Sequence, residues 1–155
     1  MSAGFDQVEA IRYAVFSDEQ GLDPAQEIDE IDETALHALL FVGSFREIDG
    51  GQAPAVGTGR LFQQDGVWRI GRISVLKDFR GDGYGEVITR MLCGKAFELD
   101  PEKDVVLHAH MGAVDFYKKI GFQEEGEVFF SGGRDHLAMR LREIDFRPQC
   151  GHDEA

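Results

Sequence analysis

The sequence predicts an α/β (α+β) fold with a mixed β-sheet flanked by helices. Segments with the residue pattern of strands come first and are joined by short turns, which favours antiparallel hairpins, whereas a strand–helix–strand unit in the middle favours a parallel pair. The 155 residues suit one domain with its own core, and neither a repeat nor a linker divides them. We therefore expect a single domain over 1–145 and a polar tail over 146–155.

The first half of the chain predicts one helix and three strands. Apolar side chains recur at helical spacing over 5–20, and Gly21 ends this helix. The segment 37–46 is rich in Leu, Phe and Val, which is typical of a buried strand. Asp65 and Gly66 form a tight-hairpin signal, so we expect two further strands on either side of them, at 55–64 and 67–76.

The second half alternates helices with strands. Apolar positions repeat with helical spacing over 84–99, and Pro101 follows the end of that helix. Gly121 ends a second, shorter helix, and a Gly-rich turn at 131–133 precedes the last strand. The remaining expected elements are a strand at 105–110, the short helix at 113–120 and strands at 127–130 and 136–141. Together the segments make a sheet of about six strands.

The chain is strongly acidic, with 29 Asp and Glu against 16 Lys and Arg and a net charge of −13. Such a field repels nucleic acids and anionic membranes, so neither is an expected partner. No window approaches about 18 consecutive apolar residues, and the N-terminus lacks the pattern of a secretory signal. Cys93 and Cys150 have no paired motif spacing, so a disulfide is not expected. The expected location is cytoplasmic.

The strongest local signal is a Gly-rich turn between a strand and a helix, with glycines at 81, 83 and 85. Glycines permit positive φ and let a ligand approach the bare backbone, while the free N–H groups and dipole of a helix's first turn bind anions. Lys77 and Arg80 add positive charge. The pattern is neither Walker A nor the Rossmann fingerprint. It predicts a pyrophosphate site, although an ordinary structural turn has the same composition.

A second signal follows one strand later. In the short helix at 113–120, Phe116 and Tyr117 are adjacent, and Gly121 provides the stop. On its own such an aromatic pair is more often part of a core than of a catalytic site. The order and spacing of the two signals therefore carry more information than either signal alone.

Together the two segments resemble the acetyl-CoA-binding core of the GNAT superfamily of N-acetyltransferases. Arg80, Gly83 and Gly85 match its Arg/Gln-x-x-Gly-x-Gly/Ala motif. The later Ala-x-x-Phe-Tyr-x-x-x-Gly-Phe motif is matched by Ala113, Phe116, Tyr117, Gly121 and Phe122. Further positions over about 11–141 are similar to the ElaA/YjcF-like branch: Val15-Phe16, Glu19-Gln20-Gly21, Glu27-Ile28-Asp29, Asp32, His37, Gly57 to Leu61, Gly71-Arg72, Gly133, His136 and Met139. The resemblance implies the acyl-CoA N-acyltransferase fold, whose central sheet has a V-shaped splay.

The resemblance also implies transfer of an acetyl group from acetyl-CoA to an amine, with few obligatory side chains. The backbone of the Gly-rich turn would bind the pyrophosphate, the Val75 amide would polarise the thioester carbonyl, and Tyr117 would protonate the leaving thiolate. A base for the amine is expected among Glu27, Asp29 and His37. The residues expected to contact acetyl-CoA are Ile73, Val75, Arg80, Gly81, Asp82, Gly83, Tyr84, Gly85, Glu86, Phe116 and Lys119.

Two other functions stay open at this point. Acyl-homoserine-lactone synthases share an Arg-x-x-x-Phe element, here Arg12 and Phe16, and a Glu-x-Asp-x-x-Asp element, here Glu27, Asp29 and Asp32, but they lack the regular Gly-rich loop. A non-catalytic CoA-binding sensor would keep the fold without turnover, and the presence of Tyr117 argues against it. The acceptor amine is not identified by the sequence, and a homodimer is compatible with a GNAT protein of this size.

Three histidines are the remaining candidates for chemistry. His108 and His110 lie two apart on a predicted strand and therefore share a face, and His136 lies on a later strand. No Cys or nearby carboxylate completes a metal site, so no metal is expected. The chain departs from its branch at His110, where Gln is typical. It also departs at the N-terminus, where little chain precedes Arg12 for the strand with which GNAT domains usually begin.

Overall fold

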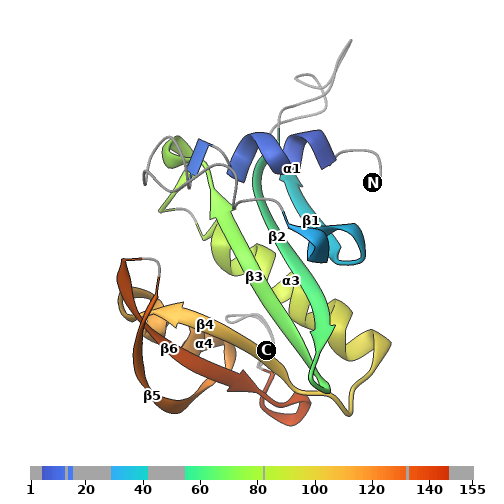
Figure 1. Cartoon of the computed structure of the whole chain (residues 1–155), viewed down its shortest axis with the longest axis vertical. Coiled ribbons are helices and arrows are strands. Elements are labelled where there is room, and N and C mark those ends of the chain that lie inside the picture. Colours follow the sequence, from blue (N-terminus) through green and yellow to red (C-terminus); the bar gives the residue numbers. More distant parts are fainter. Residues whose placement is uncertain are drawn as a thin grey trace, which may run out of the picture. The chain divides into compact units, whose positions relative to one another are not determined.

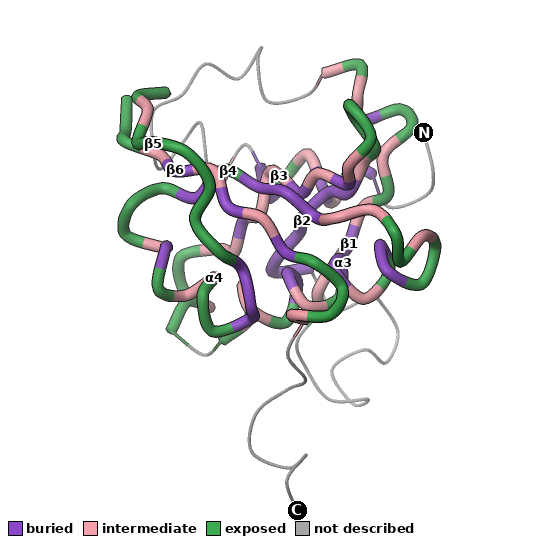
Figure 2. The backbone as a smooth tube through the Cα atoms, turned by 90° about the horizontal axis from the view of Figure 1, so that it is seen from below, coloured by how far each residue is buried: buried purple, intermediate pink, exposed green. Residues whose placement is uncertain are grey.

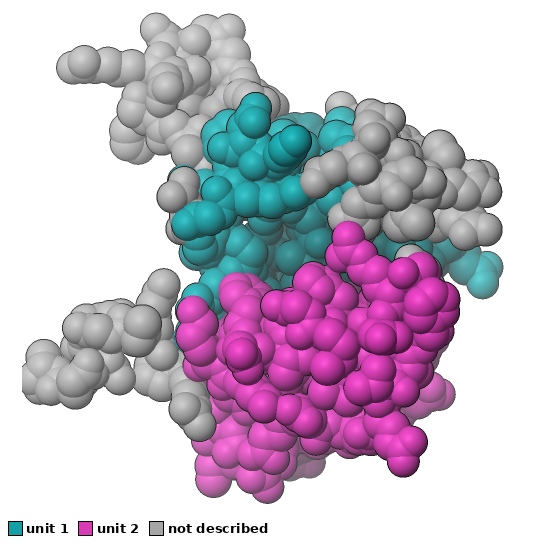
Figure 3. All heavy atoms as spheres, turned by 90° about the vertical axis from the view of Figure 1, so that its left-hand side faces the viewer, with its two compact units in different colours: residues 1–62, 72–92 teal, residues 63–71, 93–155 magenta. Residues whose placement is uncertain are grey.

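The computed structural model describes residues 5–12, 14–15, 29–41, 55–81, 83–131 and 133–146. The chain divides into two compact units (Figure 3). Unit 1 consists of residues 1–62 and 72–92, and unit 2 of residues 63–71 and 93–155. The expected single domain stays a prediction.

The described strands are β1 (Leu36–Phe41), β2 (Ala55–Gln64), β3 (Val67–Val75), β4 (Val105–His110), β5 (Gln123–Ser131) and β6 (Arg134–Leu141) (Figure 1). Their hydrogen-bonding order is β1-β2-β3-β4-β6-β5. β1 runs antiparallel to β2, β3 is parallel to β4, and β6 is antiparallel to both β4 and β5. The mixed sheet of about six strands is therefore confirmed, whereas its V-shaped splay stays a prediction.

The described helices are α1 (Phe5–Arg12), α3 (Tyr84–Leu99) and α4 (Val114–Ile120). The predicted helix at 84–99 is confirmed at both ends. The short helix begins one residue later than expected because Met111–Ala113 form a 3-10 turn in front of it. The first helix is described to Arg12, with Ala14 and Val15 in a π-helical turn; residues 13 and 16–20 of the predicted segment and its stop, Gly21, lie outside the described residues. None of the helices in the described part of the chain is long and apolar enough to cross a bilayer.

Close packing of β2 against α3 organises unit 1. Every residue of β2 from Ala55 to Leu61 is buried. Gly59 permits this contact, because a Cβ added there would lie only 3.0 Å from Ile88 Cγ2 and 3.0 Å from Leu92 Cδ1. The absence of a side chain at Gly59 therefore allows β2 and α3 to pack this closely.

The core of unit 2 lies between its strands and α4, which covers one side of β4, β6 and β5 (Figures 1 and 2). β6 alternates between exposed or half-buried and fully buried positions, as expected for a strand with one covered face. The buried side chains of this core include Val105, Leu107, Ala109, Val114, Ile120, Leu137, Met139 and Leu141. The opposite face of β4 carries the exposed His108 and His110.

β5 is longer than the expected segment 127–130. It spans Gln123–Ser131, and its register against β6 shifts between Glu125 and Phe129, where Gly126 has a φ of 85°. Nearly all of its side chains are exposed. The strand therefore lacks the apolar alternation by which a sequence reveals where a strand begins.

Candidate active site

The Gly-rich turn joins the end of β3 to the start of α3 in unit 1. After Val75 the chain forms a 3-10 turn at Lys77–Phe79, and the Arg80 side chain folds back so that its Nε donates to the Val75 carbonyl oxygen, 2.9 Å away. Gly81 and Gly83 follow with φ values of 94° and 84°. A Cβ added at either glycine would meet nothing within 4 Å. The backbone here is therefore bare and faces open space, so a ligand can approach it directly.

The start of α3 adds amide groups to this turn. The Val87 N–H bonds to the Gly83 carbonyl oxygen at 3.1 Å, so the amides just before Val87 precede the helical hydrogen-bond ladder. Glu86 is held by Arg90, whose Nε lies 2.8 Å from Glu86 Oε2. Asp82 lies outside the described residues. Bare backbone and the positive end of a helix dipole together provide what a pyrophosphate requires.

β3 contains a local irregularity that the sequence did not predict. Arg72 has a φ of 54°, in the left-handed region that residues other than glycine rarely adopt. The Ser74 hydroxyl donates to the Arg72 carbonyl oxygen at 3.1 Å. This irregularity lies directly before Ile73 and Val75, two of the residues expected to contact acetyl-CoA. No feature of the sequence signals it, because an arginine adopts this conformation only when its surroundings impose it.

Tyr117 lies on α4 in unit 2, between two phenylalanine rings. Its ring centroid is 4.8 Å from that of Phe116 and 5.7 Å from that of Phe122, both in edge-to-face arrangement. Burial, reinforced by Cys93, raises the pKa of Tyr117 to about 12. The phenol therefore keeps its proton at physiological pH, so it is able to donate a proton but not to accept one.

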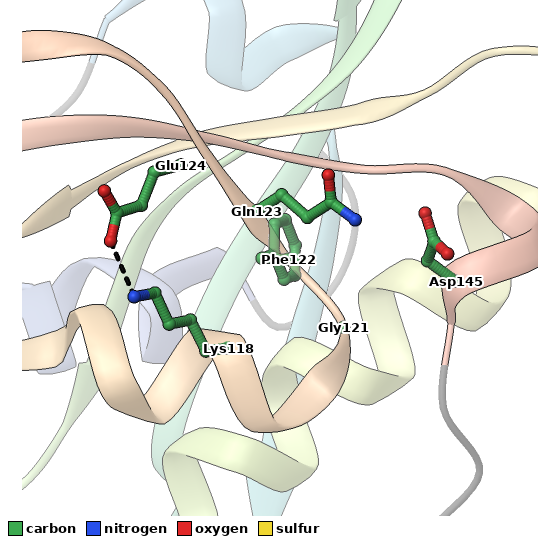
Figure 4. A pocket seen from close by; sticks show the side chains of 6 residues that line it. All are labelled: Lys118, Gly121, Phe122, Gln123, Glu124 and Asp145. Atoms are coloured by element: carbon green, nitrogen blue, oxygen red, sulfur yellow. Dashed lines mark ion pairs between the residues drawn. The ribbon is translucent and has the colours of Figure 1, made fainter.

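The end of α4 is fixed by Gly121. Its φ is 125°, and an added Cβ would overlap the backbone carbonyl of Asp145, so only glycine fits. Beside it lies a surface pocket of about 370 Å³, and two of its lining residues, Lys118 and Glu124, form an ion pair of 2.6 Å (Figure 4). The pocket is lined by Lys118, Gly121, Phe122, Gln123, Glu124 and Asp145. None of the predicted site residues is among them.

Two candidates for the base, Asp29 and His37, belong to an ion-pair network in unit 1. Arg12 Nη1 lies 2.9 Å from Asp32 Oδ2. Arg60 Nη1 bridges the two acids, at 3.1 Å from Asp32 Oδ1 and 2.7 Å from Asp29 Oδ1. His37 Nε2 donates to the backbone carbonyl oxygen of Asp32 at 3.0 Å. Each of these side chains therefore takes part in an ion pair or a hydrogen bond within unit 1.

Asp32 is the centre of this network. The side chains of Arg12 and Asp32 are both fully enclosed. Burial alone would raise the pKa of Asp32, but the hydrogen bonds from Arg12 and the Asp29 amide, with the charges of Arg12 and Arg60, outweigh it and lower the pKa to about 2. The network thus stabilises a buried carboxylate. Glu27, the third candidate for the base, lies outside the described residues.

Three histidines lie on the face of unit 2 opposite α4. His110 of β4 pairs directly across the ladder with His136 of β6. The Phe129 ring is edge-to-face with His108, at 5.0 Å between centroids, and nearly parallel to His136, at 5.8 Å. In the part of the chain that the structure describes, no group of three His, Cys, Asp or Glu side chains is arranged to hold a metal ion. The histidines therefore form a ring cluster with Phe129.

The predicted site residues fall into two groups. The described members of the first group lie together on β3, the Gly-rich turn and the start of α3 in unit 1: Ile73, Val75, Arg80, Gly81, Gly83, Tyr84, Gly85 and Glu86. The second group lies on α4 in unit 2: Phe116, Tyr117 and Lys119. His37 lies on β1 in unit 1, within the ion-pair network.

Comparison with known proteins identifies the class. Residues 49–143 match the family described as "Acetyltransferase (GNAT) domain". The chain is 35% identical over 130 residues to the "Uncharacterized N-acetyltransferase YjcF" of Bacillus subtilis (strain 168), covering 83% of this chain and 86% of that protein. It is similar to the crystal structure of Escherichia coli ElaA, with a TM-score of 0.75, 26% identity and coverage of 92% and 93%. A Bacillus subtilis acetyltransferase solved in complex with CoA has a TM-score of 0.60 at 19% identity, covering 77% of this chain and 85% of that one, and shows the fold alone.

The chain therefore belongs to the GNAT family of acetyltransferases, which makes it an acyltransferase. Its likeness to YjcF and ElaA assigns it to the ElaA/YjcF-like branch of that family. The fold and the family that the two sequence motifs predicted are both confirmed.

Proposed function

We propose that the chain is an N-acetyltransferase that moves the acetyl group of acetyl-CoA to a primary amine of a small molecule or peptide by direct attack. The observation that carries the proposal is the strand–turn–helix of unit 1, in which Arg80 is anchored on Val75 and two glycines of positive φ precede α3. Family membership supports the acyl donor, because a protein of this fold was solved with CoA bound. The proposed location is the cytoplasm, and a homodimer is compatible with the proposal.

Acetyl-CoA would be held mainly by backbone groups. The open space before Gly81 and Gly83 fits a pyrophosphate bound by the amides of the turn and of the first turn of α3. Ile73 and Val75 would hydrogen-bond the pantetheine arm, and the Val75 amide would polarise the thioester carbonyl. Phe116 and Lys119 would complete the donor contacts from α4.

Direct transfer forms one C–N bond and breaks one C–S bond. The neutral amine attacks the thioester carbon, and the leaving thiolate takes the phenolic proton of Tyr117. The raised pKa keeps the phenol of Tyr117 protonated at neutral pH, the form that a general acid requires, and makes it a weaker acid than an ordinary tyrosine. A direct attack requires no covalent enzyme intermediate, and so no nucleophilic side chain.

Calorimetric binding of acetyl-CoA tests the donor site. Gly83→Glu places a negative side chain in the proposed pyrophosphate turn and should abolish binding. Gly66→Glu is the matched control, because Gly66 also has a positive φ, 81°, with nothing within 4 Å of an added Cβ, but lies in the β2–β3 hairpin. Micromolar binding by the wild type and the control that is lost in Gly83→Glu supports the proposal. An absence of binding by the wild type contradicts it.

Turnover separates an enzyme from a non-catalytic CoA-binding module. Release of thiol from acetyl-CoA is followed with a panel of primary amines. Acetyl-CoA binding without thiol release for any amine would favour the module. The acyl-homoserine-lactone synthase alternative is less favoured, because the chain has the regular Gly-rich loop that those synthases lack.

A further inference from the structure

β5 is the last strand of the sheet, and within the described residues only one of its two edges is paired. It is hydrogen-bonded to β6, and no other described strand lies beyond it. Figure 2 shows most of its length as exposed. Such an edge carries a row of backbone N–H and C=O groups with which another strand can pair, so proteins usually protect it with charges or a bulge. The two halves of β5 differ in this protection.

The first half of β5, residues 123–126, is protected. Its register against β6 shifts after Glu125, and Gly126 has a φ of 85° at this point. An irregularity of this kind bends the edge away from a second strand. The acids of this half are also neutralised within the chain, because Glu124 pairs with Lys118 at 2.6 Å and Glu125 with Arg140 at 2.6 Å. This half therefore offers no regular edge to a partner.

The second half of β5, residues 127–131, has the opposite character. Phe129, Phe130 and Ser131 pair with β6 in a regular register. Two large apolar side chains of this half are exposed, Val128 at 51% and Phe130 at 72%. Aromatic and β-branched side chains are the ones that pack best against each other across neighbouring strands. This half therefore presents a regular edge with apolar side chains that no described element covers.

Two opposite charges lie at the ends of this second half. Glu127 belongs to β5, and Arg134 of β6 pairs across the hairpin with Ser131. Both charged side chains are exposed, and neither forms an ion pair with another residue that the structure describes. A two-fold interface brings the same surface of two copies together, so it requires a surface that carries both partners of each contact. Glu127 and Arg134 meet this requirement.

We infer that residues 127–131 pair antiparallel with the same residues of a second copy of this chain, so that the sheets of two chains join edge to edge. A two-fold axis at Phe129 places Val128 of each copy opposite Phe130 of the other, with about 5 Å between their Cβ atoms. Each exposed apolar side chain then covers another. An axis at Val128 would instead place Phe130 opposite Gly126, at the irregular part of the strand, and would leave its ring uncovered.

The same register aligns the two charges. Glu127 lies opposite Ser131 of the second copy, and Ser131 pairs on its other side with Arg134. Directly opposed residues share a face of the sheet, so these three form one row across three strands. Neighbouring strands are about 4.8 Å apart, so roughly 10 Å separates the Cα atoms of the two charged residues, which their long side chains span above the small serine. The two-fold axis makes this contact twice.

The strength of this association follows from its size and charge. Two five-residue edges bury less than the roughly 1,200 Å² at which stable interfaces begin, and two chains of net charge −13 repel each other. We therefore expect a reversible dimer with a Kd on the order of 10 μM. The pairing uses neither the Gly-rich turn nor Tyr117, so it is independent of the proposed function and is tested without acetyl-CoA.

Sedimentation equilibrium of the full chain tests the pairing, and the wild type should show a monomer–dimer equilibrium. Glu127→Arg and Arg134→Glu each place like charges in both rows, so each variant alone should have a dimer Kd at least about 10-fold higher. An equimolar mixture of the two variants should form a heterodimer with a Kd close to that of the wild type, because each row then contains one Arg and one Glu. A variant that merely fails to fold does not recover in this way.

Glu102→Arg is the matched control, because Glu102 is exposed in the turn after α3 and its replacement changes the net charge equally. Its dimer should be no weaker than that of the wild type. Phe130→Ser should also raise the Kd by about 10-fold, since it removes the most exposed ring of this edge. A wild type that stays monomeric up to about 200 μM, a dimer that neither charge reversal weakens, or a mixture of the two reversals that stays monomeric would each overturn the inference.

Discussion

At the residue scale, the surroundings of Tyr117 determine what its hydroxyl group can do. The two phenylalanine contacts involve the ring and not the oxygen, so Tyr117→Phe preserves the packing and removes only the proton. We expect kcat for thiol release to fall by about 100-fold or more, while the Kd for acetyl-CoA measured by calorimetry stays the same. Full activity in Tyr117→Phe would exclude the phenol as the acid.

The pH dependence follows from the same residue. The proposed proton donor is the protonated phenol of Tyr117. Because its pKa is raised to about 12, the phenol stays protonated to a higher pH than an ordinary tyrosine does. The wild type should therefore show no loss of kcat from Tyr117 ionisation near pH 10. An alkaline limb at that pH, absent from Tyr117→Phe, would contradict the buried environment described for this ring.

Asp32 provides a prediction about stability. In the folded protein the pKa of the Asp32 carboxyl group is about 2, below its ordinary value of 3.8. The stabilisation is thus complete above pH 4 and is lost as the pH falls towards 2, a change of roughly 2 kcal/mol. Asp32→Asn also removes the buried carboxylate that pairs with both Arg12 and Arg60, so the free energy of unfolding at pH 7 should fall by about 3–5 kcal/mol.

Urea denaturation at several pH values measures both effects. The wild type should lose stability between pH 4 and 2 more steeply than Asp32→Asn does. Glu33→Gln is a suitable control, because Glu33 is exposed in the same 3-10 turn. Parallel pH profiles for the wild type and Asp32→Asn would show that the ion pair with Arg12 contributes no pH-dependent stability.

Some residues of the candidate site could be predicted from the sequence and others could not. The Gly-rich turn before a helix and the place of Tyr117 on a short helix were predictable, because both depend on neighbours within a few positions. The network of Asp29 and His37 was not, because Asp29 meets Arg60 across 31 positions of sequence. The left-handed Arg72 was not predictable either, since nothing in its residue type favours that conformation.

At the element scale, the contact between β2 and α3 determines where the Gly-rich turn is presented. A Cβ at Gly59 would press on Ile88, Leu92 and Ile73 at 3.0, 3.0 and 3.2 Å. All three would have to shift, so Gly59→Ala should destabilise the fold by about 1–3 kcal/mol. Because α3 moves with them, the affinity for acetyl-CoA should also fall. Chemical denaturation and calorimetry measure the two effects.

Gly94→Ala is the matched control within α3 itself. A Cβ at this position meets nothing within 4 Å, so the substitution adds helix propensity without a clash. It should raise the free energy of unfolding by about 0.5–1 kcal/mol. If Gly59→Ala were as stable as Gly94→Ala, the close approach of β2 to α3 would not be a constraint on the fold.

The elements differ in how well the sequence predicted them. The β2–β3 hairpin and α3 carried their own signals, a two-residue turn and a long apolar periodicity, and both were confirmed. β5 carried neither, because it is an exposed edge strand whose pairing is set by β6 rather than by its own pattern. Its predicted start was therefore four residues too late.

At the scale of the whole molecule, the residues proposed to bind one ligand belong to both compact units. The turn and the start of α3 lie in unit 1, whereas Phe116, Tyr117 and Lys119 lie in unit 2. The sequence predicted both groups from the order of two motifs, but spacing along a chain does not establish that they serve the same ligand.

The net charge of −13 affects how acetyl-CoA, itself an anion, is bound. The overall field of the protein repels an anion, so local groups must supply the attraction.

Hydrogen exchange with and without acetyl-CoA tests whether both groups serve one ligand. If acetyl-CoA contacts both units, it should slow the exchange of amides at 81–87 and also at 114–120. At a concentration 100 times the Kd, linkage gives about 2.7 kcal/mol, or roughly 100-fold slower exchange for amides that open only in the unbound protein. Gly83→Glu should abolish the protection in both segments, whereas Gly66→Glu should retain it. Protection confined to 81–87 would show that α4 takes no part in donor binding, and the role proposed for Tyr117 would then have no structural basis.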